Sequence, residues 1–277
     1  MSTDFSGNTF RLAVSDKAEN KLGSGGSAQR TSRCLYYYAE RNGQGVISLQ
    51  ALNGKYFPSG RKKELTLEEL IESYRPEPLL YYNKIKPVVD GVESDLEKGE
   101  KNLEGERADA AAKCFKRALE VDDENIRGLF GLGMAYLAAG KTEEAGELLG
   151  RIMDLEIAFD AAHSHLFNQF GIRMRKAGML SQALDYYNKA IALNGEDEHL
   201  YFNLCRIHYE MSDFDAALGC VAKALHLNGE FPEGKKMLAY LIKMKPETAC
   251  SLNEVHVMDV PINTTGLDLD GLPWENS

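Results

Sequence analysis

The sequence predicts a mostly α fold, an α-solenoid of helix-turn-helix repeats with a small N-terminal α+β unit. Two observations lead to this fold class. A pattern of about 34 residues recurs four times between Val92 and Asn228, and such a period is the signature of a stacked repeat array. Before the array, two runs rich in aromatic and β-branched residues flank a glycine-containing segment, which is the pattern of a hairpin followed here by a helix.

Residues 1–33 contain many Gly and Ser and few large apolar side chains, so we expect a disordered arm that cannot repay the entropy of ordering. The α+β unit and its connector span residues 34–86. Its two strand-like runs, LYYYAE and VISLQAL, are joined by a turn over Arg41–Gly45. A second turn at Asn53-Gly54 follows, and Thr66 with Glu69 forms a capping box that opens a short helix ending before Pro76. Because two or three short strands are marginal alone, we expect this unit to pack onto the first repeat.

Small residues set the register of the four repeats, which span residues 87–230. Position 8 of the pattern is occupied by Gly99, Gly133, Gly171 and Cys205, at spacings of 34, 38 and 34 residues. Position 20 is occupied by Ala111, Ala145, Ala183 and Ala217. The segments KAIALNGE and KALHLNGE, which begin at Lys189 and Lys223, are nearly identical and 34 residues apart. The register therefore holds with one four-residue insertion.

This pattern resembles the tetratricopeptide repeat, a 34-residue pair of antiparallel helices. The resemblance implies that the small residues at positions 8 and 20 let the two helices approach closely, and that large apolar side chains fill the remaining space. The first repeat departs from the pattern, since Asp95 and Lys98 stand where large apolar residues are expected. Residues 231–245 continue the register and are similar to the helix that closes such arrays. We do not recognise residues 34–86 as any family.

The resemblance also implies a groove lined by the first helix of each repeat. Its predicted peptide-contacting residues are Leu96, Leu103, Phe130, Met134, Leu137, Asn168, Ile172, Arg175, Phe202, Asn203, Arg206 and Tyr209. The N-terminal half of this groove is an apolar strip, flanked in the first repeat by Glu93, Glu97, Glu100 and Glu104, and the C-terminal half is more polar and basic. Either a partner peptide or the chain's own hairpin unit or tail could cover the strip. The lysines that bind chaperone C-termini in the family are replaced here by Leu96, Phe130 and His165, which disfavours that ligand.

The final segment, residues 246–277, is predicted to be an acidic extended tail. It has six Asp or Glu and no Lys or Arg, whereas residues 1–63 have ten Lys or Arg against four Asp or Glu. The tail ends in TTGLDLDGLPWENS, and its candidate docking residues are Leu267, Leu269, Leu272 and Trp274. One hypothesis is that these residues plug a groove of the same or a neighbouring molecule, or serve as a linear motif for another protein; the alternative is a solubilising tail.

Composition narrows the class of protein. The formal net charge of -10 disfavours nucleic acid and anionic membranes as partners. No run approaches 18 apolar residues and the N-terminus lacks the order of a secretory signal, so the expected localisation is cytoplasmic. The five cysteines are scattered without a CxxC pair, and we interpret them as buried thiols instead of a disulfide framework or a zinc site.

We find no nucleophile motif, and we expect no catalytic residue, no cofactor and no metal site. His165 and His199 occupy the same position in adjacent repeats, which places them about 10 Å apart, too far to share one metal ion. The sequence therefore predicts a non-enzymatic adaptor that binds a protein or peptide partner, with self-association through the tail as an option. The alternatives are a chaperone for a secreted or assembling subunit, and a ligand-sensing or catalytic unit at residues 34–86 tethered to the array.

Overall fold

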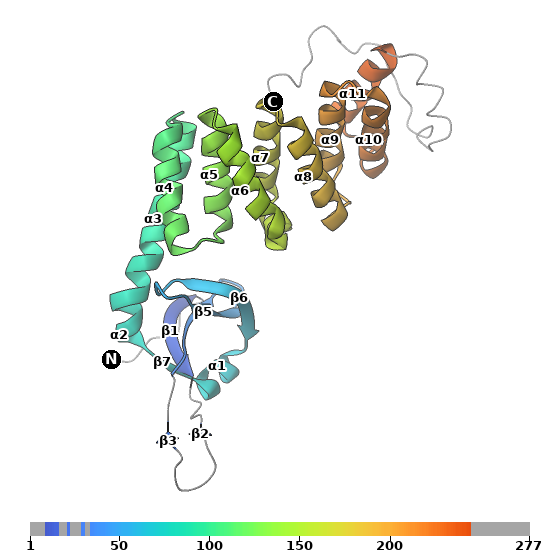
Figure 1. Cartoon of the computed structure of the whole chain (residues 1–277). Coiled ribbons are helices and arrows are strands. Elements are labelled where there is room, and N and C mark those ends of the chain that lie inside the picture. Colours follow the sequence, from blue (N-terminus) through green and yellow to red (C-terminus); the bar gives the residue numbers. More distant parts are fainter. Residues whose placement is uncertain (1–8, 17–20, 23–28, 31–33, 245–277) are drawn as a thin grey trace. The chain divides into compact units, whose positions relative to one another are not determined.

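A computed structural model describes residues 9–16, 21–22, 29–30 and 34–244. An antiparallel sheet comes first along the chain and pairs of helices follow it (Figure 1), which confirms the predicted fold class. The chain divides into two compact units. The first unit contains residues up to Asn102 together with Lys113–Gly128, and the second contains Leu103–Ala112 and the residues from Leu129 onward.

The sheet of the first unit has five antiparallel strands in the order β6-β5-β4-β1-β7. Their bounds are β1 Phe10–Asp16, β4 Tyr36–Arg41, β5 Ile47–Leu52, β6 Pro58–Leu65 and β7 Tyr74–Pro76. A separate pair of short strands, β2 Lys21–Leu22 and β3 Gln29–Arg30, lies between β1 and β4 in the sequence. The predicted turn joins β4 to β5: Asn42 Oδ1 accepts hydrogen bonds from the backbone N–H groups of Gln44 and Val46, and Gly45 has a positive φ of 85°, which glycine adopts without strain.

The expectation that residues 1–33 form a disordered arm is wrong for Phe10–Asp16. This segment forms β1, which pairs with β4 along one side and with β7 along the other. Its side chains alternate between two faces, so that Val14 joins one hydrophobic cluster and Ala13 joins another. Hydrogen bonding on both edges and burial on both faces together order a segment that is too short to be stable alone.

Each face of the sheet is covered by a helical segment of the same unit. Helix α1, Leu67–Ser73, begins with the predicted capping box between Thr66 and Glu69, and its Leu70 packs with Ile47 and Leu49 on one face. On the other face lies Ile85, which ends a π-helical segment, η1 Tyr81–Ile85, that follows α2, Pro78–Leu80.

The first helix pair, α3 Lys86–Glu104 and α4 Ala108–Val121, continues from this segment. Val89 of α3 packs with Ile85 against the sheet. The second sheet turn also contacts α4, because Asn53 Nδ2 donates to the backbone carbonyl of Val121 at 2.8 Å and Lys55 Nζ donates to that of Glu120. The sheet is therefore joined to the first repeat by apolar contacts and by hydrogen bonds to the C-terminal end of α4.

After the first helix pair, the described residues up to Met244 form three further helix pairs and a closing helix. Their bounds are α5 Ile126–Ala138, α6 Thr142–Asp154, α7 Ser164–Lys176, α8 Leu180–Leu193, α9 Glu198–Glu210, α10 Phe214–Leu227 and α11 Pro232–Met244. The four-residue insertion falls between α6 and α7, where two 3₁₀ segments form, η2 Glu156–Phe159 and η3 Ala161–His163. First helices contact first helices, as α7 does α9, and second helices contact second helices, as α6 does α8. We call these the first-helix row and the second-helix row.

Glycines allow close contact between the two helices of a repeat. A Cβ atom on Gly99 would lie 2.6 Å from the ring of Phe115, and one on Gly171 would overlap the phenol of Tyr187. Both contacts join the small residue at position 8 in the first helix to a large side chain of the second helix. The turn after each first helix is also repeated. It places a left-handed residue at the same position four times, at Glu106, Gly140, Gly178 and Ser212, which is how helices commonly end.

Candidate peptide-binding surface

The apolar strip predicted for the N-terminal half of the groove is not a free surface, so this part of the site prediction is wrong. Phe130 is fully buried and its ring packs edge-to-face against Phe170, with centroids 5.8 Å apart. The other members of the strip are also buried, except that Leu103 is half-buried; they are Leu96, Met134 and Leu137. Phe130 contacts the next first helix, α7, because large side chains on this face fill the space within the first-helix row.

Two of the four glutamates that flank the predicted strip in the first repeat form ion pairs. Arg127 forms ion pairs with Glu93 at 2.8 Å and with Glu100 at 2.9 Å, and Glu97 and Glu104 are exposed. Asp95, which replaces an expected apolar residue, forms an ion pair with Arg117 of α4. At this position, an ion pair between the two helices of the first repeat thus replaces the apolar contact that the pattern predicts.

The polar half of the predicted groove does come together, on α7, α8 and α9. Arg175, Tyr187, Arg206 and Glu210 lie close to one another. Together with Asn168 of α7 and Asn203 of α9, we call them the polar cluster. Asn168 and Arg175 lie on α7 and are seven residues apart, so they share one face of that helix. Asn203 and Arg206 lie on α9 and are buried, at 7% and 4% exposure. Buried polar side chains on adjacent helices are uncommon and indicate a site or a structural network.

Charge in the polar cluster is dominated by two guanidinium groups. Arg175 donates to the carboxylate of Glu210, which links α7 to α9. Burial and the nearby charge of Arg175 lower the pKa of Arg206 to about 10, although the carboxylate of Glu210 acts in the opposite direction. The guanidinium carbon of Arg206 also lies 5.9 Å from the centroid of the Phe202 ring, close enough for a cation–π contact.

Tyr187 completes the polar cluster from α8 and was not among the predicted site residues. Its position in the repeat is one for a large apolar side chain, and its ring is buried as that position requires. Burial raises the pKa of its phenol, whereas the charges of Arg175 and Arg206 act to lower it. The hydroxyl contacts α7 at Gly171. The signal in the sequence was the pairing of a tyrosine with the smallest residue at the opposite position.

Three buried atoms of the polar cluster make no hydrogen bond to the residues that the structure describes. They are Asn168 Oδ1, Arg175 Nε and Tyr187 Oη. Most buried polar atoms in folded proteins have a partner, so each exception needs an explanation. Here the three atoms come from two neighbouring helices and present both donor and acceptor groups. Along α7, the acceptor of Asn168 and the donor of Arg175 are two helical turns apart, so an extended ligand that lies along this helix face could bond to both.

The remaining predicted groove residues lie around the polar cluster. Ile172 is half-buried, and it shares the helix face of Asn168 and Arg175 by its spacing. Phe202 is buried, with its ring against Phe231. Tyr209 is half-buried, and its hydroxyl lies 3.0 Å from that of Tyr240 on α11. Ile172 is thus the predicted apolar residue that remains partly accessible beside the polar cluster.

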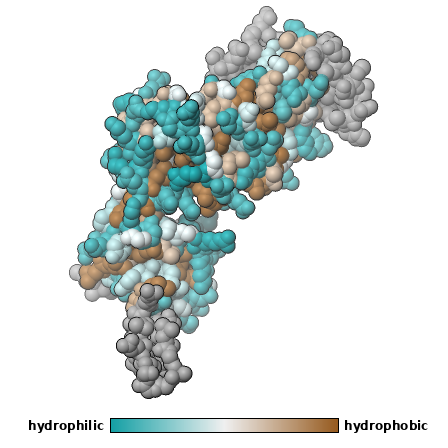
Figure 2. Space-filling view, viewed as in Figure 1, coloured by the Kyte–Doolittle hydropathy of each residue, from teal (hydrophilic) through white to brown (hydrophobic). Residues whose placement is uncertain are grey.

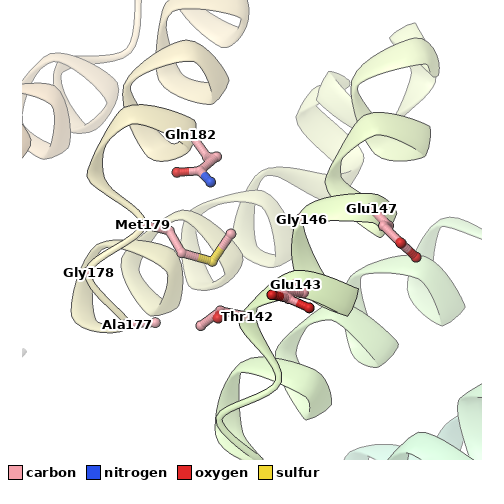
Figure 3. A pocket seen from close by; sticks show the side chains of 8 residues that line it. All are labelled: Thr142, Glu143, Gly146, Glu147, Ala177, Gly178, Met179 and Gln182. Carbon is pink, nitrogen blue, oxygen red and sulfur yellow. The ribbon is translucent and has the colours of Figure 1, made fainter.

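A pocket of about 590 Å³ lies on the second-helix row, between α6 and the start of α8 (Figure 3). Thr142 and Glu143 line its α6 side, and Met179 and Gln182 line its α8 side. The side chain of Met179 is buried, and a Cβ atom on Gly146 would lie 3.8 Å from its methyl group. The lining offers no opposed set of charged groups such as that of the polar cluster.

The sheet unit has pockets too, which bear on the alternative of a ligand-binding N-terminal unit. One of about 550 Å³ is lined by Arg11, Glu40, Tyr81 and Lys86, among others. Three of its charged side chains form ion pairs: Arg11 pairs with Glu40 at 2.7 Å, and Lys86 pairs with Asp90 at 2.5 Å. Arg41 also lines this pocket, and its Nε donates to the backbone carbonyl of Gly45 at 3.3 Å.

The described histidines and cysteines bear on two predictions, the absence of a metal site and the burial of the thiols. No group of three or more His, Cys, Asp or Glu side chains within the described ranges could hold a metal ion. Cys114 and Cys205 are buried, but the expectation of buried thiols is wrong for Cys34, which is exposed; it precedes β4 at the edge of the described sheet segment. Cys250 lies outside the described residues.

Two other expectations concern the C-terminal tail and membrane-spanning segments. The tail residues Leu267, Leu269, Leu272 and Trp274 lie outside the described residues. Among the helices that the structure describes, none is both long and apolar enough to cross a membrane. On the face shown in Figure 2, hydrophobic and hydrophilic residues alternate in small patches over the helices.

Comparison with known proteins identifies the repeats. The sequence pattern of the tetratricopeptide repeat family matches residues 102–156 and 174–241. The probable UDP-N-acetylglucosamine--peptide N-acetylglucosaminyltransferase SPINDLY of Hordeum vulgare is 30% identical over 117 residues, which cover 41% of this chain and 12% of that protein. Anaphase-promoting complex subunit 3 of Schizosaccharomyces pombe is 23% identical over 120 residues, which cover 43% of this chain and 17% of that protein.

Among solved structures, MamA from residue 41 to its end, from Desulfovibrio magneticus RS-1, is similar at 16% identity. The match covers 62% of this chain and 95% of that one, with a TM-score of 0.46. The chain spans only 12% and 17% of the length of the two curated relatives.

Proposed function

This chain is a tetratricopeptide repeat protein over residues 102–156 and 174–241, and from this premise we propose that it is a non-catalytic adaptor that binds a peptide or protein segment on the first helices α7 and α9. Arrays of this kind present extended surfaces along one row of helices, and they recognise partners there instead of enclosing a reacting centre. The observation that carries the proposal is the polar cluster, where buried donors and acceptors from consecutive repeats meet.

The chemistry of the polar cluster suits an extended peptide. A peptide backbone alternates N–H donors and carbonyl acceptors, and a site with both kinds of group can bond to them. Arg175 Nε can donate to a carbonyl or carboxylate, and Asn168 Oδ1 can accept from an N–H. Ile172, half-buried between these two residues on α7, offers an apolar contact for an adjacent side chain. Localisation in the cytoplasm is part of the proposal.

Site-specific photo-crosslinking tests the proposal. A photo-reactive amino acid replaces Ile172 on α7 in one variant and Asp185, which is exposed on α8, in a matched control. After irradiation in cells, we expect position 172 to yield a discrete set of crosslinked proteins that position 185 does not yield. Arg175→Gln in the first variant should remove those products, while circular dichroism shows that the helices remain folded. Identical products at both positions, or products insensitive to Arg175→Gln, would contradict the proposal.

A further inference from the structure

A second pocket of the sheet unit, of about 430 Å³, has lining residues that all belong to the first compact unit. Side chains of β1, β4, β5 and β6 form its sheet wall, and side chains of α3 and the residue after α4 form its helical wall. It is next to the pocket of about 550 Å³, since Arg11 and Glu40 line both. Its volume is within the range of sites for small molecules.

Tyr38 places a buried phenol in the sheet wall of this pocket. The residue is only 6% exposed, and the charges that act on its hydroxyl include those of Glu40, Arg11 and Asp90, which line the same pocket. Burial raises the pKa of the phenol, so the hydroxyl keeps its proton at neutral pH and can donate. It makes no hydrogen bond to the residues that the structure describes. Because most buried polar groups have a partner, this hydroxyl points to an acceptor in the pocket.

The strand register places a cation on the same wall. Tyr38 of β4 pairs directly with Gln50 of β5, and residues 60–62 of β6 form the bulge opposite Gln50. Lys62 of this bulge lines the pocket, and it forms no ion pair within the described part of the chain. Neighbouring strands are about 4.8 Å apart, so the two side chains begin about 10 Å apart and are long enough to reach one group between them. The sheet wall therefore offers donors and a positive charge to an anionic group.

The helical wall offers the opposite charge. Two carboxylates of α3, Asp90 and Glu93, are already in ion pairs. Asp122, which follows α4, is half-buried and has no ion pair among the described residues. Its carboxylate accepts a hydrogen bond from Asn125 Nδ2 at 3.1 Å, yet burial raises its pKa. A cation in the pocket would stabilise the ionised form of this carboxylate.

From these two walls we infer that the pocket binds a free α-amino acid, with the carboxylate of the ligand toward Tyr38 and Lys62 and its ammonium group toward Asp122. The apolar part of the lining, Phe57, Pro58 and Val89, suits an apolar side chain such as that of leucine or phenylalanine. A molecule with only one of the two charges satisfies only one wall. The inference goes beyond the adaptor function, because the sheet unit then recognises a small molecule whereas α7 and α9 recognise a protein segment.

Isothermal titration calorimetry of the full-length protein tests the inference. The probes are L-leucine and L-phenylalanine, each compared with its N-acetyl form, which lacks the ammonium group, and its amide form, which lacks the carboxylate. We expect a free amino acid to bind at least about tenfold more tightly than either of its modified forms, since each modification removes one charged contact. Failure of both free amino acids to bind, or equal binding of a modified form, would overturn the inference. This comparison does not depend on the folding of any variant.

Substitutions assign the two walls. Lys62→Met and Asp122→Asn should each lower the affinity for the amino acid about tenfold, and Tyr38→Phe should weaken binding while its ring remains in place. The matched control is Lys63→Met, which removes a neighbouring exposed ammonium group that does not line the pocket, and we expect it to bind as the unmodified protein does. Circular dichroism checks that each variant is folded. Equal losses in Lys62→Met and Lys63→Met, or unchanged affinity in Asp122→Asn, would contradict the assigned contacts.

Discussion

Arg175 on α7 and Glu210 on α9 form an ion pair that joins the first helices of consecutive repeats. The side chain of Arg175 is 10% exposed and that of Glu210 is 33% exposed, so the pair is more shielded from solvent than a typical surface pair. Arg206 lies close enough for its pKa to be lowered by the charge of Arg175. Glu210 therefore offsets repulsion between two buried cations as well as linking two helices.

We expect Glu210→Gln to lower the free energy of unfolding by about 1 to 3 kcal/mol, because it leaves a shielded guanidinium without its charged partner. The measurement is urea denaturation followed by circular dichroism. The matched control is Glu147→Gln on α6, where the side chain is exposed and a change within about 0.5 kcal/mol is expected. Equal effects of the two substitutions would show that the Arg175–Glu210 pair contributes no net stability.

The contact between Gly171 and Tyr187 predicts an unusual response to alanine. A methyl group at Gly171 would overlap the phenol of Tyr187, and Tyr187 is almost fully buried. We expect Gly171→Ala to destabilise the protein by about 1 to 3 kcal/mol through overpacking. It should also change the near-ultraviolet circular dichroism of the tyrosines.

Gly150 of α6 is the matched control for this prediction. It is also within a helix, but a Cβ atom there would meet nothing within 4 Å. Because alanine is the better helix former, Gly150→Ala should stabilise the protein by about 0.5 to 1 kcal/mol. If Gly171→Ala also stabilised the protein, Tyr187 would have to move aside without cost.

The repeated left-handed turn residue predicts a stabilising substitution at Ser212. Its φ of 62° is unfavourable for a residue with a Cβ atom, and glycine removes that penalty. We expect Ser212→Gly to raise the free energy of unfolding by about 1 kcal/mol. Met211→Gly serves as control. Met211 has a negative φ of -78°, which other residues adopt without strain, so glycine there should destabilise the protein. A loss of stability in Ser212→Gly would contradict this account of the turn.

The repeats could be predicted from the sequence because their signals are local and recur. The small residues at positions 8 and 20, such as Gly99 and Ala111, recur at a regular spacing and set the register. The capping box at Thr66 was also visible, because its two partners are three residues apart. Strand β1 was missed because its order depends on partners in β4 and β7, and a seven-residue strand has little local signal of its own.

The candidate site could be predicted only in part. The positions of Arg175, Asn203 and Arg206 followed from the repeat register, but their burial and mutual distance depend on how α7, α8 and α9 pack. The same packing decides that Phe130 contacts Phe170 instead of a ligand. Sequence position places a residue on the inner side of a helix, and only the neighbouring helix determines whether that residue is accessible.

The thiols provide a direct test of burial across both units. Cys34 is exposed and Cys205 is buried, and burial raises the pKa of the Cys205 thiol well above its usual range. Burial also raises the pKa of Cys220 to about 11, so that about one molecule in a thousand carries its reactive thiolate at pH 8.

In a Cys250→Ser background, we therefore expect maleimide at pH 8 to label one thiol rapidly and the others only after unfolding in guanidinium chloride. Cys34→Ser should abolish the rapid phase, whereas a rapid phase that persists in this variant would show that Cys114, Cys205 or Cys220 becomes accessible through local opening of the helices.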